Sequence, residues 1–478
     1  MDKIQQNRRE FLKGTAWLSA AAVAAGCMGT RMSYGGGGSM SQFRTKPMDK
    51  IRVGVVGLGD RGRPAVHRIA LIPGCEVTAL CDLLPERVSE CQKWLHEHGR
   101  PKAREYVGEE AYKRMCDADD VDVVYNVTPI DWHRPISCYA MKAGKHTLLE
   151  VCGCSTTEEC WEFVETCEAT RRHCMMLENC CYGEYELLQL NLVRQGILGD
   201  IIHAEAGYVH DCRQYKFKQA AEHNAWRLRR ALEHRGNQYP THGLGPIALA
   251  MNINRGDRFD YLTAIESRPA ALSEYTKAKF AADSWQNKLK YSAGDMSITN
   301  IRTVNGSTIT LQYDVVSPRP YSRINLLSGT KGISMSYPRF NIAFEKQVGD
   351  NGAHKYFDDA KAEAVRKAYK HPLWKVAGDV AARLGGHGGM DFIMDLRWAY
   401  CLQNGLPLDM DVYDLASWSS IFQLSEASVN NRSKVIDIPD FTRGGWKTAH
   451  AAEIGGVDLK KMGLDDSKIK KDSSQLSV

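Results

Sequence analysis

The feature that most constrains the fold of this chain is a glycine-rich turn, Gly57-Leu-Gly59-Asp-Arg-Gly62, between two apolar segments. Residues 51–56 have the composition of a β-strand, and residues 63–72 have helical spacing. Such a turn brings the backbone close to a pyrophosphate, which the N–H groups and dipole of the helix N-terminus can bind. The pattern predicts a dinucleotide-binding unit, with a glycine turn that binds no nucleotide as the alternative.

An aspartate at the end of the next strand strengthens this prediction. Residues 76–81 form a second apolar run, and Asp82 follows it twenty residues after Gly62. A carboxylate there accepts hydrogen bonds from the adenosine ribose hydroxyls. Its charge would repel a 2′-phosphate, so the sequence favours NAD over NADP.

The alternation of strands and helices continues along the first third of the chain. Residues 121–127 and 146–151 are further strand candidates, and residues 85–98 and 133–143 have helical spacing. Alternation of this kind indicates an α/β fold with a doubly wound parallel sheet. We therefore expect a Rossmann domain over residues 50–178.

The pattern changes beyond residue 178. Apolar or alternating runs, separated by turns such as Asn305-Gly306, predict a large and mostly antiparallel open sheet. These runs are residues 201–210, 260–268, 297–304, 307–316, 321–328 and 331–336. Residues 390–404 and 412–430 read as helices that pack back on the body. The second domain is thus an α+β domain over residues 179–448, followed by a polar tail at 449–478.

The N-terminus has the features of an export signal. Asn7-Arg-Arg-Glu-Phe-Leu-Lys13 resembles the twin-arginine motif, and a short Ala-rich segment follows it. Residues 1–27 are therefore expected to be a signal for export to the periplasm, and residues 28–49 to form a flexible linker. Cleavage at Ala22 or Ala24, or acylation of Cys27 as a membrane-anchored lipoprotein, both fit the sequence. The export machinery is accordingly a predicted partner.

Charge and cysteine usage exclude other classes. The chain has 62 Lys and Arg against 57 Asp and Glu, without the basic stripe of a nucleic-acid-binding protein. Cys152-Gly-Cys154 and Cys180-Cys181 have no partner at zinc spacing. We therefore predict buried thiols and no metal.

Motifs in the first domain resemble a known family. Asn126-Val-Thr-Pro129 with His133, then Lys145-His146 leading to Glu150, is similar to the Gfo/Idh/MocA oxidoreductases. In that family a lysine after the glutamate serves as acid and base beside the nicotinamide. Here Val151 and Cys152 follow Glu150, which departs from an ordinary sugar dehydrogenase.

Longer motifs resemble a narrower family, glycoside hydrolase family 109, over residues 51–448. These motifs are Glu178–Tyr182, Gly207–Asp211, Tyr239–Pro246, Ser317–Tyr321 and Gly386–Phe392. The resemblance implies an NAD-dependent α-N-acetylgalactosaminidase. It also implies oxidation of the sugar at C3, elimination of the leaving group, addition of water and reduction. Tightly bound NAD is then regenerated in every turnover, and the partner is a glycoside or glycan terminus.

The resemblance also implies site residues. Those expected to contact NAD, together with the glycines Gly57, Gly59 and Gly62, are Asp60, Arg61, Asp82, Ile130, Asp131, Trp132, His133, Glu150, Val151 and Asn179. Those expected to contact the sugar are Tyr208, Arg227, Tyr239, Pro240, Thr241, His242 and Tyr321.

Side chains with tunable pKa values suit the proton transfers of such a reaction. His242 is the first choice as a base, with Tyr239 beside the same sugar, on a predicted loop made by Pro240 and nearby glycines. Tyr182 and His387 are further catalytic candidates. A packed core position is the alternative for Tyr182 and Tyr208, and a helix-start loop for His387.

Two other functions remain open from the sequence. One is an exported NAD-dependent sugar oxidoreductase with net redox turnover. The other is a non-catalytic protein that binds NAD or a sugar. The sequence allows a homo-oligomer without specifying one.

Overall fold

The computed structural model describes residues 38–221, 225–345 and 355–464; for residues 219–221 it describes the backbone only. The predicted signal, the first part of the linker and the end of the tail lie outside these residues. Among the described residues, no helix is long and apolar enough to cross a membrane.

The first sheet has six parallel strands in the order β3-β2-β1-β4-β5-β6. They are β1 (Ile51–Val56), β2 (Cys75–Asp82), β3 (Arg104–Val107), β4 (Val123–Asn126), β5 (His146–Leu149) and β6 (Cys174–Met176). The central strands β4 and β5 are buried along their whole length, because helices cover both faces of a parallel sheet.

Helices alternate with these strands, as the sequence predicts. They are α2 (Gly62–Leu71), α3 (Pro85–Glu97), α4 (Ala111–Cys116), α5 (His133–Lys142) and α6 (Thr157–Thr170). A capping box fixes the start of α6. The Thr156 hydroxyl accepts a hydrogen bond from the Glu159 backbone N–H, and the Glu159 carboxylate accepts one from the Thr156 backbone N–H. The Rossmann-type topology is confirmed.

The second sheet has eight strands in the order β13-β12-β11-β7-β10-β9-β8-β14. They are β7 (Ile201–Val209), β8 (Phe259–Glu266), β9 (Ser297–Thr303), β10 (Thr308–Asp314), β11 (Leu326–Gly329), β12 (Gly332–Met335), β13 (Asn341–Phe344) and β14 (Ile436–Asp437). Every pairing is antiparallel except β7 with β10. The prediction of a mostly antiparallel sheet is confirmed.

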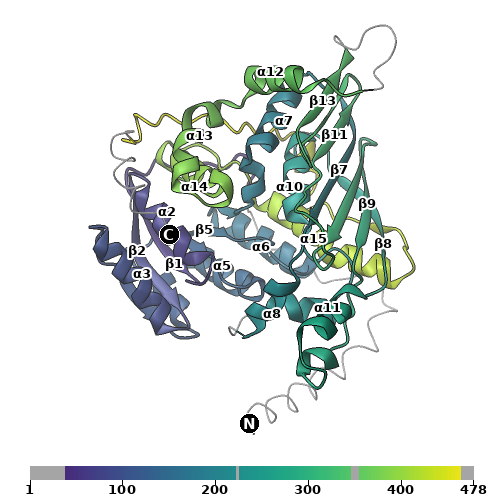
Figure 1. Cartoon of the computed structure of the whole chain (residues 1–478). Helices are drawn as coiled ribbons and strands as arrows, with labels where there is room; N and C mark the ends of the chain where they lie inside the picture. The colour runs from purple at the N-terminus through teal and green to yellow at the C-terminus, as the bar shows by residue number, and fades with distance from the viewer. Residues whose placement is uncertain (1–37, 222–224, 346–354, 465–478) are drawn as a thin grey trace. The chain divides into compact units, whose positions relative to one another are not determined.

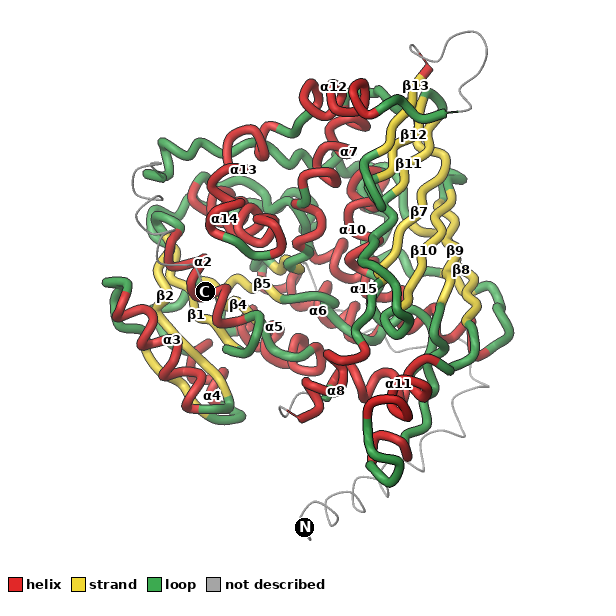
Figure 2. Tube along the Cα trace, viewed as in Figure 1, coloured by secondary structure: helices red, strands yellow, loops and turns green. Residues whose placement is uncertain are grey.

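The helices of this second part are α7 (Glu184–Arg194), α8 (Arg213–Ala221), α9 (Trp226–Glu233), α10 (Thr241–Ala250), α11 (Ala271–Lys279), α12 (Asp359–Tyr369), α13 (Pro372–Leu384), α14 (Met390–Gln403) and α15 (Val412–Asn430). Of these, α10 and α15 pack on the second sheet, while α13 and α14 lie on the side of α2 and the first sheet (Figures 1 and 2). Helix α15 packs on β8 of the second sheet and on β6 of the first, so one buried core joins the two sheets.

One predicted strand starts later than expected. The sequence suggests a strand from residue 321, whereas β11 begins at Leu326. Ile324 and Asn325 have φ values of 62° and 51°, which an extended strand does not allow. Residues 321–325 therefore form a loop at the end of the sheet, beside the site described next.

Candidate functional site

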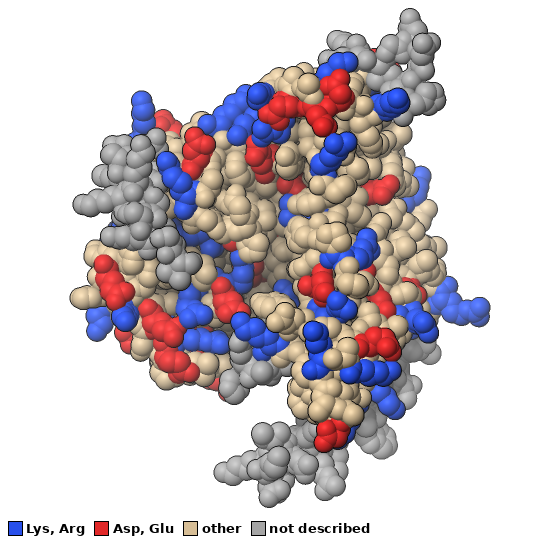
Figure 3. Space-filling view, viewed as in Figure 1, with Lys and Arg blue, Asp and Glu red and all other residues tan. Residues whose placement is uncertain are grey.

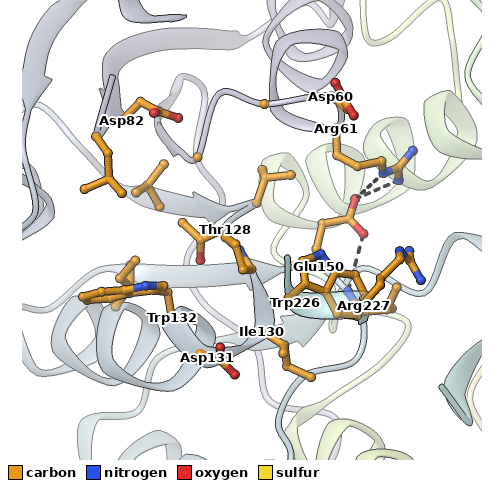
Figure 4. A pocket seen from close by; sticks show the side chains of 18 of the residues that line it. Asp60, Arg61, Asp82, Thr128, Ile130, Asp131, Trp132, Glu150, Trp226 and Arg227 are labelled. Atoms are coloured by element: carbon orange, nitrogen blue, oxygen red, sulfur yellow. Dashed lines mark hydrogen bonds and ion pairs between the residues drawn. The ribbon is translucent and has the colours of Figure 1, made fainter. Parts of the chain in front are cut away.

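An elongated pocket of about 590 Å³ runs from the carboxyl edge of the first sheet to the end of β7. Figure 4 shows Asp82 and Trp132 toward one end and Glu150, Trp226 and Arg227 toward the other. This edge of an open parallel sheet is where ligands bind in such folds. The pocket contains most of the residues predicted to contact a cofactor or a sugar.

The glycine turn is shaped for a close approach. Gly57 has a φ of 89°, and a Cβ at this position would lie 2.8 Å from the backbone of Val127 and Thr128. A Cβ on Gly62 would lie 1.8 Å from the Gly57 carbonyl oxygen. Gly62 thus makes the turn possible without lining the pocket, while Gly57, Gly59 and Asp60 line it. No side chain caps the first turn of α2, which leaves this helix end for a ligand.

Asp82 lies in the pocket at the end of β2. Its Oδ2 accepts from the Leu58 backbone N–H at 2.6 Å, and its Oδ1 accepts from that of Leu84 at 2.9 Å. These two bonds fix the carboxylate at the place predicted for ribose binding. Arg87, which the sequence interpretation missed, lies 3.9 Å from Oδ1 and also lines the pocket.

The loop after β4 forms the opposite wall. Ile130, Asp131 and Trp132 make a short 3₁₀ turn, η1, and all three line the pocket. Asp131 is paired with Arg229 of α9, so the second domain contributes to this wall. The glycine turn, the uncapped helix end, Asp82 and this wall together fit a dinucleotide.

A buried network holds the centre of the pocket. Glu150 Oε1 accepts from Arg61 Nη2 at 2.7 Å, and Arg61 Nη1 donates to Asp391 Oδ2 at 2.8 Å. Asn179 Nδ2 donates to the other oxygen of Asp391 at 2.6 Å. Burial opposes the charged form of Asp391, but the hydrogen bond from His387 and the nearby arginines hold its pKa well below its ordinary value. Glu150, Val151 and Asn179 all line the pocket.

His242 lies at the other end of the pocket, paired with a carboxylate. Its Nδ1 lies 2.6 Å from Glu178 Oε1, and the Glu178 side chain is fully buried. Because a carboxylate can only accept, Nδ1 carries the proton in this contact, and Nε2 is an acceptor whenever the ring is neutral. Burial alone would raise the pKa of Glu178, but the charge and hydrogen bond of His242 lower it. The pair is arranged as an oriented general base.

Aromatic rings surround His242. The ring centroids of Tyr208 and Tyr239 lie 5.1 Å and 5.0 Å from that of His242, and 4.8 Å from each other. Burial raises the pKa of both phenols, so they remain protonated hydrogen-bond donors. The Arg227 guanidinium lies 4.2 Å from the Trp226 ring centroid and 5.1 Å from that of Tyr239. This chamber combines apolar rings with a few polar groups, as small-molecule sites do.

The predicted loop at Tyr239–His242 is confirmed for Tyr239 and Pro240 but wrong for Thr241 and His242. Pro240 is the N-cap of α10, and Thr241 and His242 begin the helix. Gly243 and Gly245 allow tight packing instead of loop flexibility, since a Cβ on Gly243 would lie 2.5 Å from the Gly207 nitrogen. Pro240 and Thr241 are buried beside the pocket without lining it, so their role is to position His242.

Tyr182 and His133 also differ from expectation. Tyr182 is fully buried and donates to Asp409 Oδ2 at 2.9 Å, away from the pocket lining, so its phenol is not placed for proton transfer. The ring nitrogens of His133 lie 2.9 Å and 2.8 Å from the carbonyls of Cys152 and Thr128. His133 therefore braces two loops instead of contacting a cofactor with its side chain.

Tyr321 and His387 lie at the margin of the site. Tyr321 does not line the pocket, but its ring centroid lies 6.3 Å from that of Tyr208. His387 lines the pocket from the 3₁₀ turn η5 (His387–Gly389), with Nδ1 2.9 Å from Asp391 Oδ2. Both remain candidates, with His387 tied to the central network.

The cysteines behave as predicted. All fourteen cysteines that the structure describes are free, and every one except Cys75 is buried. Within the described residues, Glu178, Cys180 and His242 are close enough to hold a metal ion. However, His242 Nδ1 is bonded to Glu178, and burial raises the pKa of the Cys180 thiol well above its ordinary value. This chemistry favours a hydrogen-bonded pair, and the absence of a metal stays a prediction.

Several site residues escaped the sequence interpretation. His210, Tyr215 and Trp226 line the pocket together with His242, and Glu178 holds His242 Nδ1 by a hydrogen bond. Glu178 opens one of the family motifs, two residues after the end of β6 and at the carboxyl edge of the sheet. That position was the signal that could have identified it.

Comparisons with known proteins agree with this architecture. Residues 51–178 match the oxidoreductase family with an NAD-binding Rossmann fold, the Gfo/Idh/MocA family. A solved levoglucosan dehydrogenase, in complex with NADH and levoglucosan, has a TM-score of 0.60 at 18% identity, covering 82% of this chain and 100% of that chain. The fold and the site thus define an NAD-binding protein with the two-domain architecture of the Gfo/Idh/MocA dehydrogenases.

The second domain identifies the family. Residues 182–448 match the C-terminal domain of glycosyl hydrolase 109. A glycosyl hydrolase family 109 protein of Shewanella sp. (strain ANA-3) is 44% identical over 94% of this chain and 99% of its own length. An α-N-acetylgalactosaminidase of Bacteroides fragilis is 45% identical over 86% of this chain and 96% of its own length. The chain belongs to glycoside hydrolase family 109.

Proposed function

We propose that this protein hydrolyses glycosides that end in α-linked N-acetylgalactosamine, with tightly bound NAD restored in every turnover. The observation that carries the proposal is one continuous pocket with the glycine turn at one end and the oriented His242–Glu178 pair at the other. The relatives named α-N-acetylgalactosaminidase supply the sugar and the anomer.

The chain's own residues divide the work. Gly57, Gly59 and the start of α2 would hold the pyrophosphate, and Asp82 would hold the adenosine ribose. Bound NAD supplies an acceptor and donor of hydride. Glu150, fixed by Arg61, orients the groups at the centre of the pocket.

At the sugar end, His242 Nε2 accepts a proton from the substrate, and Glu178 stabilises the resulting imidazolium. Tyr239 and Tyr208 donate hydrogen bonds to sugar oxygens, and their rings exclude water from the reacting face. Arg227 donates to an oxygen of the sugar from its place between aromatic rings, where its Nε has no hydrogen-bond partner among the described residues.

The test is hydrolysis of an aryl α-N-acetylgalactosaminide, with aglycone release and NADH absorbance followed together. Release without accumulation of NADH supports the proposal. Stoichiometric NADH would instead indicate a sugar oxidoreductase, and inactivity toward α- and β-glycosides would indicate a binding protein. His242→Ala should abolish release while the purified protein retains NAD.

Export to the periplasm is part of the proposal. It rests on Arg8 and Arg9 followed by the Ala-rich segment, which lie outside the described residues. Replacing both arginines by lysine should retain the protein in the cytoplasm, as cell fractionation would measure. Mass spectrometry of the exported form would distinguish acylation of Cys27 from cleavage after an alanine.

A further inference from the structure

Two buried cationic side chains differ from the others in the described part of the chain. The paired ones are Arg68, Arg255, Arg323 and Arg397, each with a carboxylate oxygen 2.5–2.7 Å away. Lys216 of α8 and Arg230 of α9 are only 2% and 5% exposed, yet neither has a carboxylate partner among the described residues. We call Lys216 and Arg230 the unpaired cations.

Backbone oxygens hold the unpaired cations beside residues that line the pocket. Lys216 Nζ donates to the backbone oxygen of Arg227 at 3.3 Å. Arg230 Nη1 donates to the backbone oxygen of Gln238 at 3.2 Å, and its guanidinium lies 5.6 Å from the Trp226 ring centroid. Trp226 and Arg227 line the pocket, as Figure 4 shows. The unpaired cations therefore lie directly behind one wall of the site.

Two acidic side chains of this region are already engaged. Asp131 attracts Arg230 but is bound to Arg229. Glu178 is bound to His242 at 2.6 Å. The surface differs from this wall, since Lys and Arg are interspersed with Asp and Glu on the face shown in Figure 3. The excess of positive charge is thus a local property of the pocket wall.

This arrangement is unfavourable in the resting protein. Burial, and then the charge of Arg227, lower the pKa of Lys216 to about 7, and burial also lowers the pKa of Arg230. The other ionisable groups that act on Lys216 are Cys212, just before α8, and Arg230. A buried cation without a counterion lowers the stability of a protein. Fixed charge of this kind is useful where the opposite charge develops only during a reaction.

The proposed reaction produces such a charge from a neutral glycoside. After oxidation at C3, a base removes the proton from C2, and the electron pair left behind forms the C2–C3 double bond of an enolate. The C3 oxygen then carries the negative charge. When the C3 carbonyl is restored, that pair forms the C1–C2 double bond, and the leaving group departs from C1 with the electrons of the broken C–O bond. The negative charge exists only between these two steps.

We propose that Lys216 and Arg230 stabilise this enolate through their charge, without touching the sugar. The inference rests on the proposed function. Arg227 is bonded to Lys216 and lies one helical turn before Arg230, so it continues the positive wall into the pocket. The wall stabilises the anion on the sugar while Glu178 stabilises the cation that forms on His242.

The first test removes one charge at two pH values. Lys216→Met retains most of the side-chain length, and it should lower kcat for an aryl α-N-acetylgalactosaminide about tenfold at pH 6. This is the scale of one unit charge that acts over about 10 Å at an effective dielectric constant of about 20. At pH 9 the ratio of wild-type to variant kcat should approach one, because Lys216 is then neutral. KM should change little, and Lys216→Arg should retain the wild-type kcat at pH 6.

The second test identifies the step that is slowed. With a substrate deuterated at C2, the kinetic isotope effect on kcat should be larger in Lys216→Met and Arg230→Met than in the wild type, since proton abstraction from C2 becomes slower than the other steps. The isotope effect of deuterium at C3 should not increase. Arg230→Lys, which keeps the charge, should restore the wild-type isotope effect. A loss of packing alone would not select the C2 proton.

Lys218→Met is the matched control, because it removes the same charge from an exposed position of the same helix. It should leave kcat and both isotope effects unchanged. Wild-type kcat in Lys216→Met and Arg230→Met would overturn the inference and leave the proposed function standing. An equal loss of kcat at pH 6 and pH 9, with an unchanged C2 isotope effect, would indicate a structural role and also overturn it. Loss of bound NAD from both variants would identify the dinucleotide as the counterion, with the same consequence. A wild type that releases no aglycone would overturn both proposals.

Discussion

The role of Glu178 can be tested by a substitution that removes its charge and retains its shape. In Glu178→Gln, the backbone N–H of Cys180, which donates to Oε1 at 3.2 Å, requires an acceptor at that position. The amide oxygen should therefore take the place of Oε1 and continue to accept from His242 Nδ1. The amide nitrogen then takes the place of Oε2, which has no hydrogen-bond partner among the described residues. Orientation is preserved and the negative charge is lost.

The size of the effect follows from the geometry. The Glu178–His242 contact of 2.6 Å joins a fully buried carboxylate to a ring with a side-chain exposure of 14%. A hydrogen bond to a charged group in such surroundings contributes about 1.5–3 kcal/mol. Because the imidazolium forms only as the proton is transferred, this energy is lost in the transition state. We expect kcat to fall about 10- to 100-fold, with a smaller change in KM.

The assay is steady-state release of the aglycone from an aryl α-N-acetylgalactosaminide, with the bound NAD content measured on the same preparation. Glu168→Gln is the control, since Glu168 is another largely buried carboxylate, which accepts from the Tyr413 hydroxyl at 2.7 Å far from the pocket. It should keep normal kinetics. Wild-type kcat in Glu178→Gln with full NAD content would refute the reasoning, and loss of bound NAD would show that Glu178 supports the fold of the pocket instead.

Two further predictions concern the cofactor and acid stability. Gly62→Ala should purify without bound NAD, because its Cβ would lie 1.8 Å from the Gly57 oxygen and displace the turn; a full complement of NAD, measured by absorbance after denaturation, would contradict this. Burial lowers the pKa of His146 to about 4 and that of His173 to about 3. Both are therefore neutral in the fold while the unfolded chain takes up protons below pH 6.5, so stability is present above pH 6.5 and is lost as the pH falls, by about 2 kcal/mol per histidine at pH 5. His173→Leu should lose less stability than the wild type between pH 7 and pH 5 in urea unfolding, and an identical pH dependence would exclude the assignment.

Much of the fold could be predicted because its signals are local. The strand at 51–56 and the helix at 412–430 have the same bounds in the structure, since each is a periodic run ended by turn or cap residues. The short strand β13 escaped prediction, because its few residues have no clear alternation. The helix α10 escaped for another reason: its glycines and proline resemble loop residues, and only the close approach to Gly207 explains them.

The site residues likewise differ in whether local sequence signals or long-range packing bring them together. The glycine turn and Asp82 lie within one βαβ unit, so their spacing predicts that they converge. His242 and Glu178 are 64 residues apart, and Arg61 and Asp391 are 330 apart. No periodicity connects such residues, and only the packing of the two sheets brings them together. Tyr182 illustrates the opposite error. The motif predicts a catalytic role for it, but its buried hydroxyl donates to Asp409 and lies away from the pocket lining.

The salt bridges from α14 have a consequence for protein engineering. Arg68 of α2 is 4% exposed and depends on Asp395 of α14 at 2.7 Å, and Arg61 depends on Asp391 of the same helix. An excised segment ending at residue 178 would leave Arg68 deep in its interior without its counterions, and Arg61 would retain only Glu150. The nucleotide module of this enzyme is therefore unsuited to transplantation as a cassette, and chimeras should exchange α14 along with it.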